Sequence, residues 1–278
     1  MPLDIDPVTD HREREKGVIV YPVYSRRSAG LSIGVNLFPN KKLCPFHCPY
    51  CEVFPFSRKT VFSIEQLGED LQKAILDAQK QNTIIKDICF SGNGEPTTSP
   101  DFTSAVLLAE DIRAKMVPSA KLVIVTNGVG LLLPQVFSFL KNISLLSNTD
   151  IWLKADAGTE DWYKKINRTT IPYEQLLHII KEFVSCSRVT IQTMLCAIND
   201  EQPSETEKQA WESLICELGK KSGKTCGVRK VQLYSKARPA PEDPLASQLP
   251  DDFIKERAES LRNAFLDREI TIPVEIYL

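Results

Sequence analysis

The sequence predicts an α/β fold built around a parallel sheet. Six hydrophobic segments between residues 31 and 235 have the length and composition of strands. They alternate with segments whose apolar residues recur at helical spacing. Strands and helices in this alternation form right-handed βαβ units. A doubly wound sheet and an incomplete barrel both satisfy this order, and in both the chemistry gathers at the carboxyl ends of the strands.

The expected strands and helices can be assigned along most of the chain. Residues 17–24 are extended, and Ser63 with Gln66 forms a capping box at the start of the first helix. The tail at 271–278 contains Pro273, so it is at best an edge strand. Strands are expected at 31–38, 84–91, 121–128, 150–157, 188–195 and 229–235. Helices are expected at 63–78, 101–115, 133–141, 159–166, 173–184, 204–220 and 251–267.

The chain is interpreted as one domain with short terminal additions. A polar leader covers residues 1–17, and the core domain covers 18–240. A C-terminal helix and extended tail at 241–278 are expected to pack on the core. The only linker-like stretch is 236–252, which contains four prolines.

Composition narrows the function classes only partly. The net charge of −2 gives no overall attraction to nucleic acid or anionic membranes, although an RNA substrate remains among the candidates. No apolar run reaches the roughly 18 residues of a membrane span, and the first residues resemble neither a signal nor a transit peptide. Eight cysteines without a secretory signal argue against a disulfide framework. These features predict a cytoplasmic protein with no membrane association.

Three of the eight cysteines form a C-x3-C-x2-C loop directly after a predicted strand, at Cys44, Cys48 and Cys51. A structural zinc site needs four ligands, and His47 would have to fold back to serve as the fourth. Three thiolates on one tight loop instead suit a cubane iron–sulfur cluster with one iron open to another ligand. The scattered cysteines are expected to be small buried hydrophobic residues: Cys89, Cys186, Cys196, Cys216 and Cys226.

Polar residues collect at the ends of the later strands. Residues 91–96, SGNGEP, end the second strand; glycines allow close backbone approach, and the carboxylate of Glu95 suits an ammonium group. Without the cysteine loop this stretch would be as typical of an ordinary turn as of a functional one. Lys154 and Asp156 share one strand face, which favours either a ligand contact or a structural ion pair. Asn127 belongs to the TNG motif at 126–128, which closes the third strand, and Gln192 lies on a partly polar strand face.

The cysteine loop, with an aromatic residue before its last cysteine, resembles the radical S-adenosylmethionine (SAM) superfamily. The resemblance implies an incomplete (β/α)6 TIM-like barrel and a [4Fe-4S] cluster on Cys44, Cys48 and Cys51, whose open iron chelates SAM. It also implies that Gly94 and Glu95 hold the amino group of SAM. Further SAM contacts are expected from Asn127, Lys154, Asp156 and Gln192, while catalytic side chains are not identified.

The resemblance is strongest to Fe-S oxidoreductases related to tRNA wyosine synthases. The lead-in YSRRSAGLSIGV at 24–35 carries it, and the motifs KADAG, INR, IQTM and VQLYSKARP follow in that family's order. The chain has no cysteine before Cys44 for the second cluster of archaeal-type wyosine synthases. It also lacks the flavodoxin domain of the eukaryotic versions. An external one-electron reductant of flavodoxin or ferredoxin type is therefore expected.

The leading hypothesis is an enzyme that generates a 5′-deoxyadenosyl radical and abstracts hydrogen from an unidentified substrate. tRNA-base modification and activation of a glycyl-radical partner are the alternatives within this chemistry. A non-catalytic Fe-S or zinc-binding protein is the alternative from a different class. At least one of Arg26 and Arg27 is expected near the site, whereas Arg168 is assigned to the surface.

Overall fold

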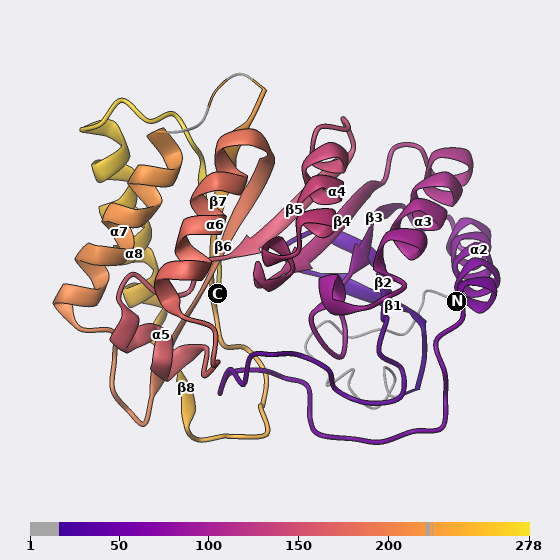
Figure 1. The fold of residues 1–278 in the computed structure, drawn as a ribbon, viewed down its shortest axis with the longest axis horizontal. Helices are drawn as coiled ribbons and strands as arrows, with labels where there is room; N and C mark the ends of the chain where they lie inside the picture. The colour runs from indigo at the N-terminus through magenta and orange to yellow at the C-terminus, as the bar shows by residue number, and fades with distance from the viewer. Residues whose placement is uncertain (1–16, 221–222, 224) are drawn as a thin grey trace. The chain divides into compact units, whose positions relative to one another are not determined.

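The computed structural model describes residues 17–220, 223 and 225–278, so the predicted leader lies outside it except for Gly17. The described chain divides into two compact units (Figure 1). The first contains 17–44, 53–126 and 146–150, and the second contains 45–52, 127–145 and the described residues from 151 on. The proposed division at 18–240 and 241–278 stays a prediction.

The first unit contains a four-stranded sheet in the order β1-β2-β3-β4 (Figure 1). The first two strands are antiparallel, and the remaining pairs are parallel. Fully buried aliphatic side chains such as Ile33, Leu71 and Ile88 form its core. The strands are β1 (Val20–Ser25), β2 (Gly30–Val35), β3 (Ile85–Phe90) and β4 (Lys121–Thr126). The helices are α2 (Ile64–Lys80), α3 (Phe102–Met116) and the 3-10 turn η1 (Pro96–Thr98).

Helix α2 begins where the sequence predicts. The Ser63 side chain accepts a hydrogen bond from the amide of Gln66 at 3.2 Å, which satisfies one of the free amides of the first turn. Leu67, Leu71 and Ile75 lie on the buried stripe. Helical periodicity and the cap therefore agree on this element.

The second unit contains parallel strands in the order β5-β6-β7-β9, with β8 antiparallel to β6. Helices α6, α7 and α8 lie together in this unit (Figure 1). Its strands are β5 (Thr149–Lys154), whose first two residues belong to the first unit, β6 (Arg188–Ile198), β7 (Gly227–Ser235), β8 (Ala246–Gln248) and β9 (Val274–Tyr277). Its helices are η2 (Val129–Leu132), α4 (Pro134–Ser144), α5 (Glu160–Ile166), α6 (Tyr173–Cys186), α7 (Glu205–Lys220) and α8 (Asp251–Leu266).

The six strands predicted between residues 31 and 235 are present as β2 to β7. The C-terminal tail forms β9 beside β7, and Pro273 lies just before this strand, where its missing amide removes no bond inside it. The stretch at 236–252 is more ordered than the linker-like composition suggested, because Ala246 to Gln248 pair with the end of β6. Because the two paired segments are far apart in the sequence, no local pattern predicts this strand.

Parallel strands bring their carboxyl ends to one edge of a sheet. In each unit, the loops that contain the predicted site residues follow these carboxyl ends. In the first unit, β2 leads toward the cysteine loop, β3 toward Gly92 to Glu95, and β4 ends at Thr126. In the second unit, β5 ends directly before Ala155 and Asp156. Within the described parts of the chain, no helix combines the length and apolar character needed to cross a membrane.

Candidate functional site

Backbone hydrogen bonds in the first unit join the start of the cysteine loop to the GNGEP turn. The amide of Leu43 donates to the carbonyl of Asn93 at 3.0 Å, and the amide of Glu95 donates to the carbonyl of Leu43 at 2.9 Å. Leu43 and Gly94 thereby form an isolated parallel bridge. Cys44 is the next residue, so the first predicted cluster ligand lies beside the predicted SAM-binding turn.

Two glycines allow this close approach. A Cβ on Gly94 would lie 1.8 Å from the carbonyl oxygen of Leu43, closer than any side chain tolerates. Gly92 has a φ of 115°, in the region that favours glycine, as expected of a residue that forms the turn. Position 94 therefore requires glycine because a Cβ would clash with Leu43. Position 92 requires glycine because of its positive φ.

We expect Gly94→Ala to separate the GNGEP turn from the cysteine loop. Overpacking of this kind costs about 1–3 kcal/mol, so the melting temperature should fall and iron retention should fall with it. Gly68→Ala is the matched control, because a Cβ there meets only Leu108 Cδ2 at an ordinary 3.5 Å. Thermal unfolding and iron analysis check both variants, and normal iron binding by Gly94→Ala would show that the bridge is dispensable.

Glu95 is buried, with 3% of its surface exposed, and its carboxylate accepts hydrogen bonds from the turn η1 and from the end of strand β4. The hydroxyl of Thr97 donates to Oε1 at 2.6 Å, and the amide of Thr97 donates to the same oxygen at 3.3 Å. The hydroxyl of Thr126, at the end of β4, also donates to Oε1 at 2.7 Å. Sequence reasoning missed both threonines. The TNG motif at 126–128 held the signal for Thr126.

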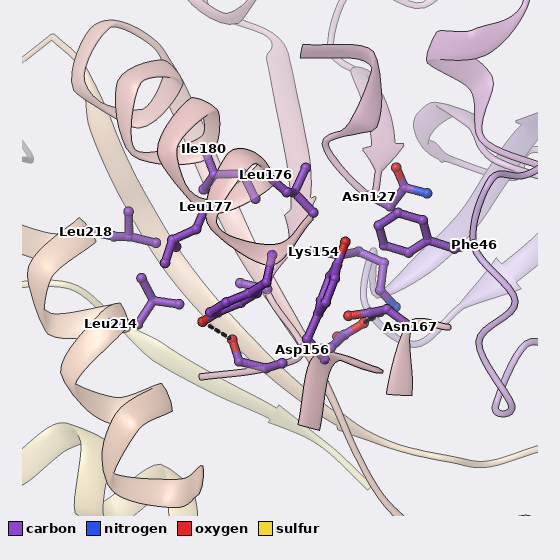
Figure 2. Close-up of a pocket in the computed structure, with 14 residues that line it drawn as sticks. Phe46, Asn127, Lys154, Asp156, Asn167, Leu176, Leu177, Ile180, Leu214 and Leu218 are labelled. Atoms are coloured by element: carbon purple, nitrogen blue, oxygen red, sulfur yellow. Dashed lines mark hydrogen bonds and ion pairs between the residues drawn. The ribbon is translucent and has the colours of Figure 1, made fainter. Parts of the chain in front are cut away.

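Lys154 and Asp156 form the polar centre of the second unit (Figure 2). Lys154 Nζ lies 3.3 Å from Asp156 Oδ2 and donates to the hydroxyl of Tyr234 at 2.7 Å. It also lies 4.5 Å from the centre of the Tyr50 ring, a cation–π distance. The amide of Met194 donates to Asp156 Oδ1 at 2.9 Å. The side chain of Asp156 has no exposed surface.

Electrostatics fix the protonation states in this centre. Burial lowers the pKa of Lys154, but the charge of Asp156 and the contact with Tyr234 outweigh burial and leave that pKa above its usual value. Burial raises the pKa of Tyr50 and the nearby Asp156 charge raises it further. Tyr50 therefore stays a phenol that donates to Asp156, while Lys154 stays an ammonium.

The later part of the cysteine loop, residues 45–52, belongs to the second unit and is held there by several contacts. The hydroxyl of Tyr50 donates to Asp156 Oδ2. Asn167 Nδ2 lies 3.6 Å from Cys48 Sγ, and the carbonyl of Asn167 accepts from the amide of His47 at 3.0 Å. Burial raises the pKa of the Cys48 thiol to about 11. Asn167 belongs to the INR motif, in which only the neighbouring Arg168 was considered from the sequence.

Three of the four later candidates for SAM contact line one cavity, and the fourth, Gln192, pairs with Lys154 across strands β5 and β6. Asn127, Lys154 and Asp156 line a shared cavity of about 30 Å³ (Figure 2). Asn127 Oδ1 accepts from the amide of Val129 at 3.0 Å. Gln192 is fully buried and donates to Gln232 at 2.7 Å. The remaining cavity walls are mostly apolar, with Phe46, Leu176, Ile180 and Leu214 among them.

The donor chemistry fits an iron–sulfur cluster at the loop. Cys44, Cys48 and Cys51 are partly exposed thiols, and none of the eight cysteines forms a disulfide. A buried carboxylate, Glu95, follows in the turn attached beside Cys44. Within the residues that the structure describes, no three His, Cys, Asp or Glu side chains are arranged to hold a single metal ion.

The two arginines of the lead-in lie at the other end of the first unit's sheet. Arg26 and Arg27 are in the turn between β1 and β2, before the amino end of β2, whereas Cys44 follows its carboxyl end. Arg26 is exposed. Burial raises the pKa of Asp87; hydrogen bonds from two serines counteract this rise, followed by the Lys121 charge and last by the Arg27 charge. The prediction of an arginine beside the cysteine loop is not supported, because the hairpin turn directs this segment away from it.

A family comparison decides the membership of the chain. The model of the radical SAM superfamily matches residues 42–210, from the cysteine loop to helix α7. This chain belongs to the radical SAM superfamily. The family predicted from the cysteine loop is therefore confirmed, and this superfamily requires SAM and an iron–sulfur cluster.

Curated relatives cover part of the chain. A UPF0026 protein of Helicobacter pylori strain J99 is 32% identical over 154 residues, which are 53% of this chain and 47% of that protein. The corresponding protein of strain 26695 is 33% identical over 159 residues, or 55% of this chain and 49% of that one. The match thus spans about half the length of these relatives.

Several solved structures share the fold. SuiB of Streptococcus suis bound to SAM superposes with a TM-score of 0.62 and 13% identity, covering 86% of this chain and 49% of SuiB. A radical SAM methyltransferase of Sphaerobacter thermophilus gives 0.61 and 13%, covering 93% and 68%. TYW1 with a lysine-pyruvate adduct gives 0.56 and 16%, covering 84% and 73%. The predicted fold class, an incomplete TIM-like barrel of the radical SAM type, is confirmed.

Proposed function

We propose that this chain binds a [4Fe-4S] cluster through Cys44, Cys48 and Cys51 and uses it to cleave SAM reductively. The observation that carries the proposal is the backbone bridge between Leu43 and Gly94, which joins the cysteine loop to the GNGEP turn. A cluster bound there would supply one electron to SAM, breaking a C–S bond to give methionine and a 5′-deoxyadenosyl radical that takes hydrogen from a substrate.

Glu95 is the residue that we assign to the amino group of SAM. Thr97 and Thr126 fix Oε1 of its carboxylate by hydrogen bonds, so the group is oriented before any ligand arrives. A buried carboxylate is costly unless it is well paired, and a ligand ammonium is a strong partner for it. This combination of burial and orientation supports binding of a cation beside Cys44.

Aromatic residues would protect the cluster from water. Phe46 and Tyr50, both within the cysteine loop, are 4% and 6% exposed. The ring of Phe46 packs edge-on against Tyr163 at 6.1 Å between ring centres. Apolar surroundings of this kind help set the potential of a cluster and limit solvent access.

The resemblance to wyosine synthases suggests tRNA as one substrate class, and we leave the substrate open. Three of the eight cysteines are the proposed ligands of the cluster, and the other five are scattered along the sequence. These five do not have the spacing that a second cluster would require. The reductant is expected to be an external flavodoxin or ferredoxin type protein, and the reducing cytoplasm is the expected location.

A non-catalytic carrier is disfavoured because it would have no use for the oriented Glu95.

The proposal is tested by anaerobic reconstitution with iron and sulfide, followed by dithionite and SAM. We expect a brown protein with about four irons per chain, as a [4Fe-4S] cluster requires, and formation of 5′-deoxyadenosine. Omitting dithionite should stop product formation. A reconstituted cluster that yields no 5′-deoxyadenosine would favour the carrier, and a colourless zinc-containing protein would exclude the cluster.

A further inference from the structure

The carboxylate of Asp156 has its bonding capacity filled by protein groups. A carboxylate offers about four lone-pair positions. Oδ1 accepts from the amide of Met194 at 2.9 Å, and Oδ2 accepts from the hydroxyl of Tyr50. Oδ2 also lies 3.3 Å from Lys154 Nζ and 3.5 Å from Asn167 Nδ2. These four contacts leave little room for a SAM hydroxyl or ammonium.

Two of these partners connect Asp156 to the cysteine loop. Tyr50 lies between Cys48 and Cys51, in a turn closed by a 3.0 Å hydrogen bond from the amide of Cys51 to the carbonyl of Cys48. Asn167 contacts Asp156 through the same amide nitrogen that lies 3.6 Å from Cys48 Sγ. The carboxylate therefore reaches both sides of the segment that carries two of the three cysteines.

The remaining partners hold Asp156 itself in place. The Met194 amide belongs to strand β6, and Lys154 belongs to strand β5, so two rigid strands fix the carboxylate. The Lys154 ammonium compensates its charge, and Tyr234 on β7 holds that ammonium in turn. A buried and fully paired network of this kind restrains side chains more strongly than an exposed one.

We propose that Asp156 is a positioning residue for the cluster loop, holding Tyr50 and Asn167 so that Cys48 and Cys51 are preoriented for the cluster. This inference rests on the proposed cluster site and replaces the expected contact between Asp156 and SAM. The hydroxyl of Tyr50 is the link between carboxylate and loop, whereas its ring fills the surrounding space. Removing the hydroxyl should therefore weaken the hold on the loop without removing a cluster ligand.

The decisive experiment compares reconstituted wild type with Tyr50→Phe, Asp156→Asn and the double variant. Loss of a hydrogen bond to a buried charge is expected to make a chelator remove iron from Tyr50→Phe roughly tenfold faster. SAM affinity, measured by equilibrium binding, should stay within about twofold for an interaction of this indirect kind. The double variant should release iron no faster than Asp156→Asn, because both changes break one link.

Tyr173→Phe is the matched control. Tyr173 is also buried in the second unit, and its hydroxyl donates to the carbonyl of Ala157 at 3.4 Å. Iron release from this variant should equal that of wild type. Electron paramagnetic resonance of the reduced cluster adds a second measurement, since a displaced cysteine loop changes the cluster signal and a general loss of stability does not.

Two results would overturn the inference and leave the proposed cluster site intact. Equal iron release from Tyr50→Phe and wild type would show that the link to Asp156 does not hold the loop. Weaker SAM binding by Asp156→Asn with unchanged iron release would make Asp156 a SAM ligand. Failure of the wild type to take up any iron would instead refute the proposed cluster site, and the inference with it.

Discussion

Alanine at Cys44, Cys48 or Cys51 is expected to abolish iron retention, reducing a reconstituted protein from about four irons per chain to almost none. Each of these cysteines supplies one of only three thiolates, and the two that remain after a substitution cannot retain a cubane cluster. Iron analysis and visible absorbance after anaerobic desalting measure the effect. Formation of 5′-deoxyadenosine should disappear in the same variants.

The five other cysteines supply matched controls. Cys196→Ala is the sharpest, because Cys196 is buried in the second unit, which also contains Cys48 and Cys51. This variant should keep its iron, since Cys196 is assigned to the hydrophobic interior. Loss of iron in it, or in the alanine variants of Cys89, Cys186, Cys216 and Cys226, would show that the ligand assignment is wrong.

Glu95→Gln is expected to weaken SAM binding at least tenfold while iron content stays normal. The three hydrogen bonds from Thr97 and Thr126 all reach Oε1, so the amide oxygen of glutamine should take that place. The amide NH₂ then faces the ligand where a carboxylate oxygen stood. A charge-assisted hydrogen bond is worth about 1.5–3 kcal/mol, and about 1.4 kcal/mol is tenfold in affinity.

Glu207→Gln controls for the general effect of removing a buried carboxylate. Glu207 is 4% exposed and accepts hydrogen bonds from Gly158 and Thr159, as Glu95 does from its threonines. It lies in helix α7, outside the GNGEP turn. Equilibrium binding of SAM should separate the two variants: equal affinities for wild type and Glu95→Gln would end the assignment of Glu95 to SAM.

Local sequence patterns were sufficient for the order of elements. Helix α2 illustrates why: its cap at Ser63 and its stripe of Leu67, Leu71 and Ile75 are encoded within seventeen consecutive residues and the preceding residue. Strand β8 shows the limit, because its three residues become a strand only through pairing with β6. A short segment rich in proline carries no period that reveals such a partner.

The candidate site shows the same division between local and long-range information. Gly94 and Glu95 were predicted from the resemblance of the SGNGEP turn to a motif of the superfamily, and the structure shows that a side chain at Gly94 would clash with Leu43. The partners of Glu95 could not be predicted, because Thr126 lies 31 residues away on another strand. For Lys154 and Asp156, the alternatives of ligand contact and structural ion pair were both visible in the sequence, and an ion pair is present.

The sequence by itself determined the family, the alternation of strands and helices, and the three thiols, since these depend on residue type and spacing along a short segment. Only the tertiary structure decided which polar residues meet. Tyr50 and Asp156 are 106 positions apart and their contact depends on how strand β5 and the cysteine loop pack. Arg26 and Arg27, close to Cys44 in sequence, are directed to the opposite end of β2 by a hairpin turn. Spacing along the chain identifies ligands on one loop, whereas packing assigns the groups that hold that loop in place.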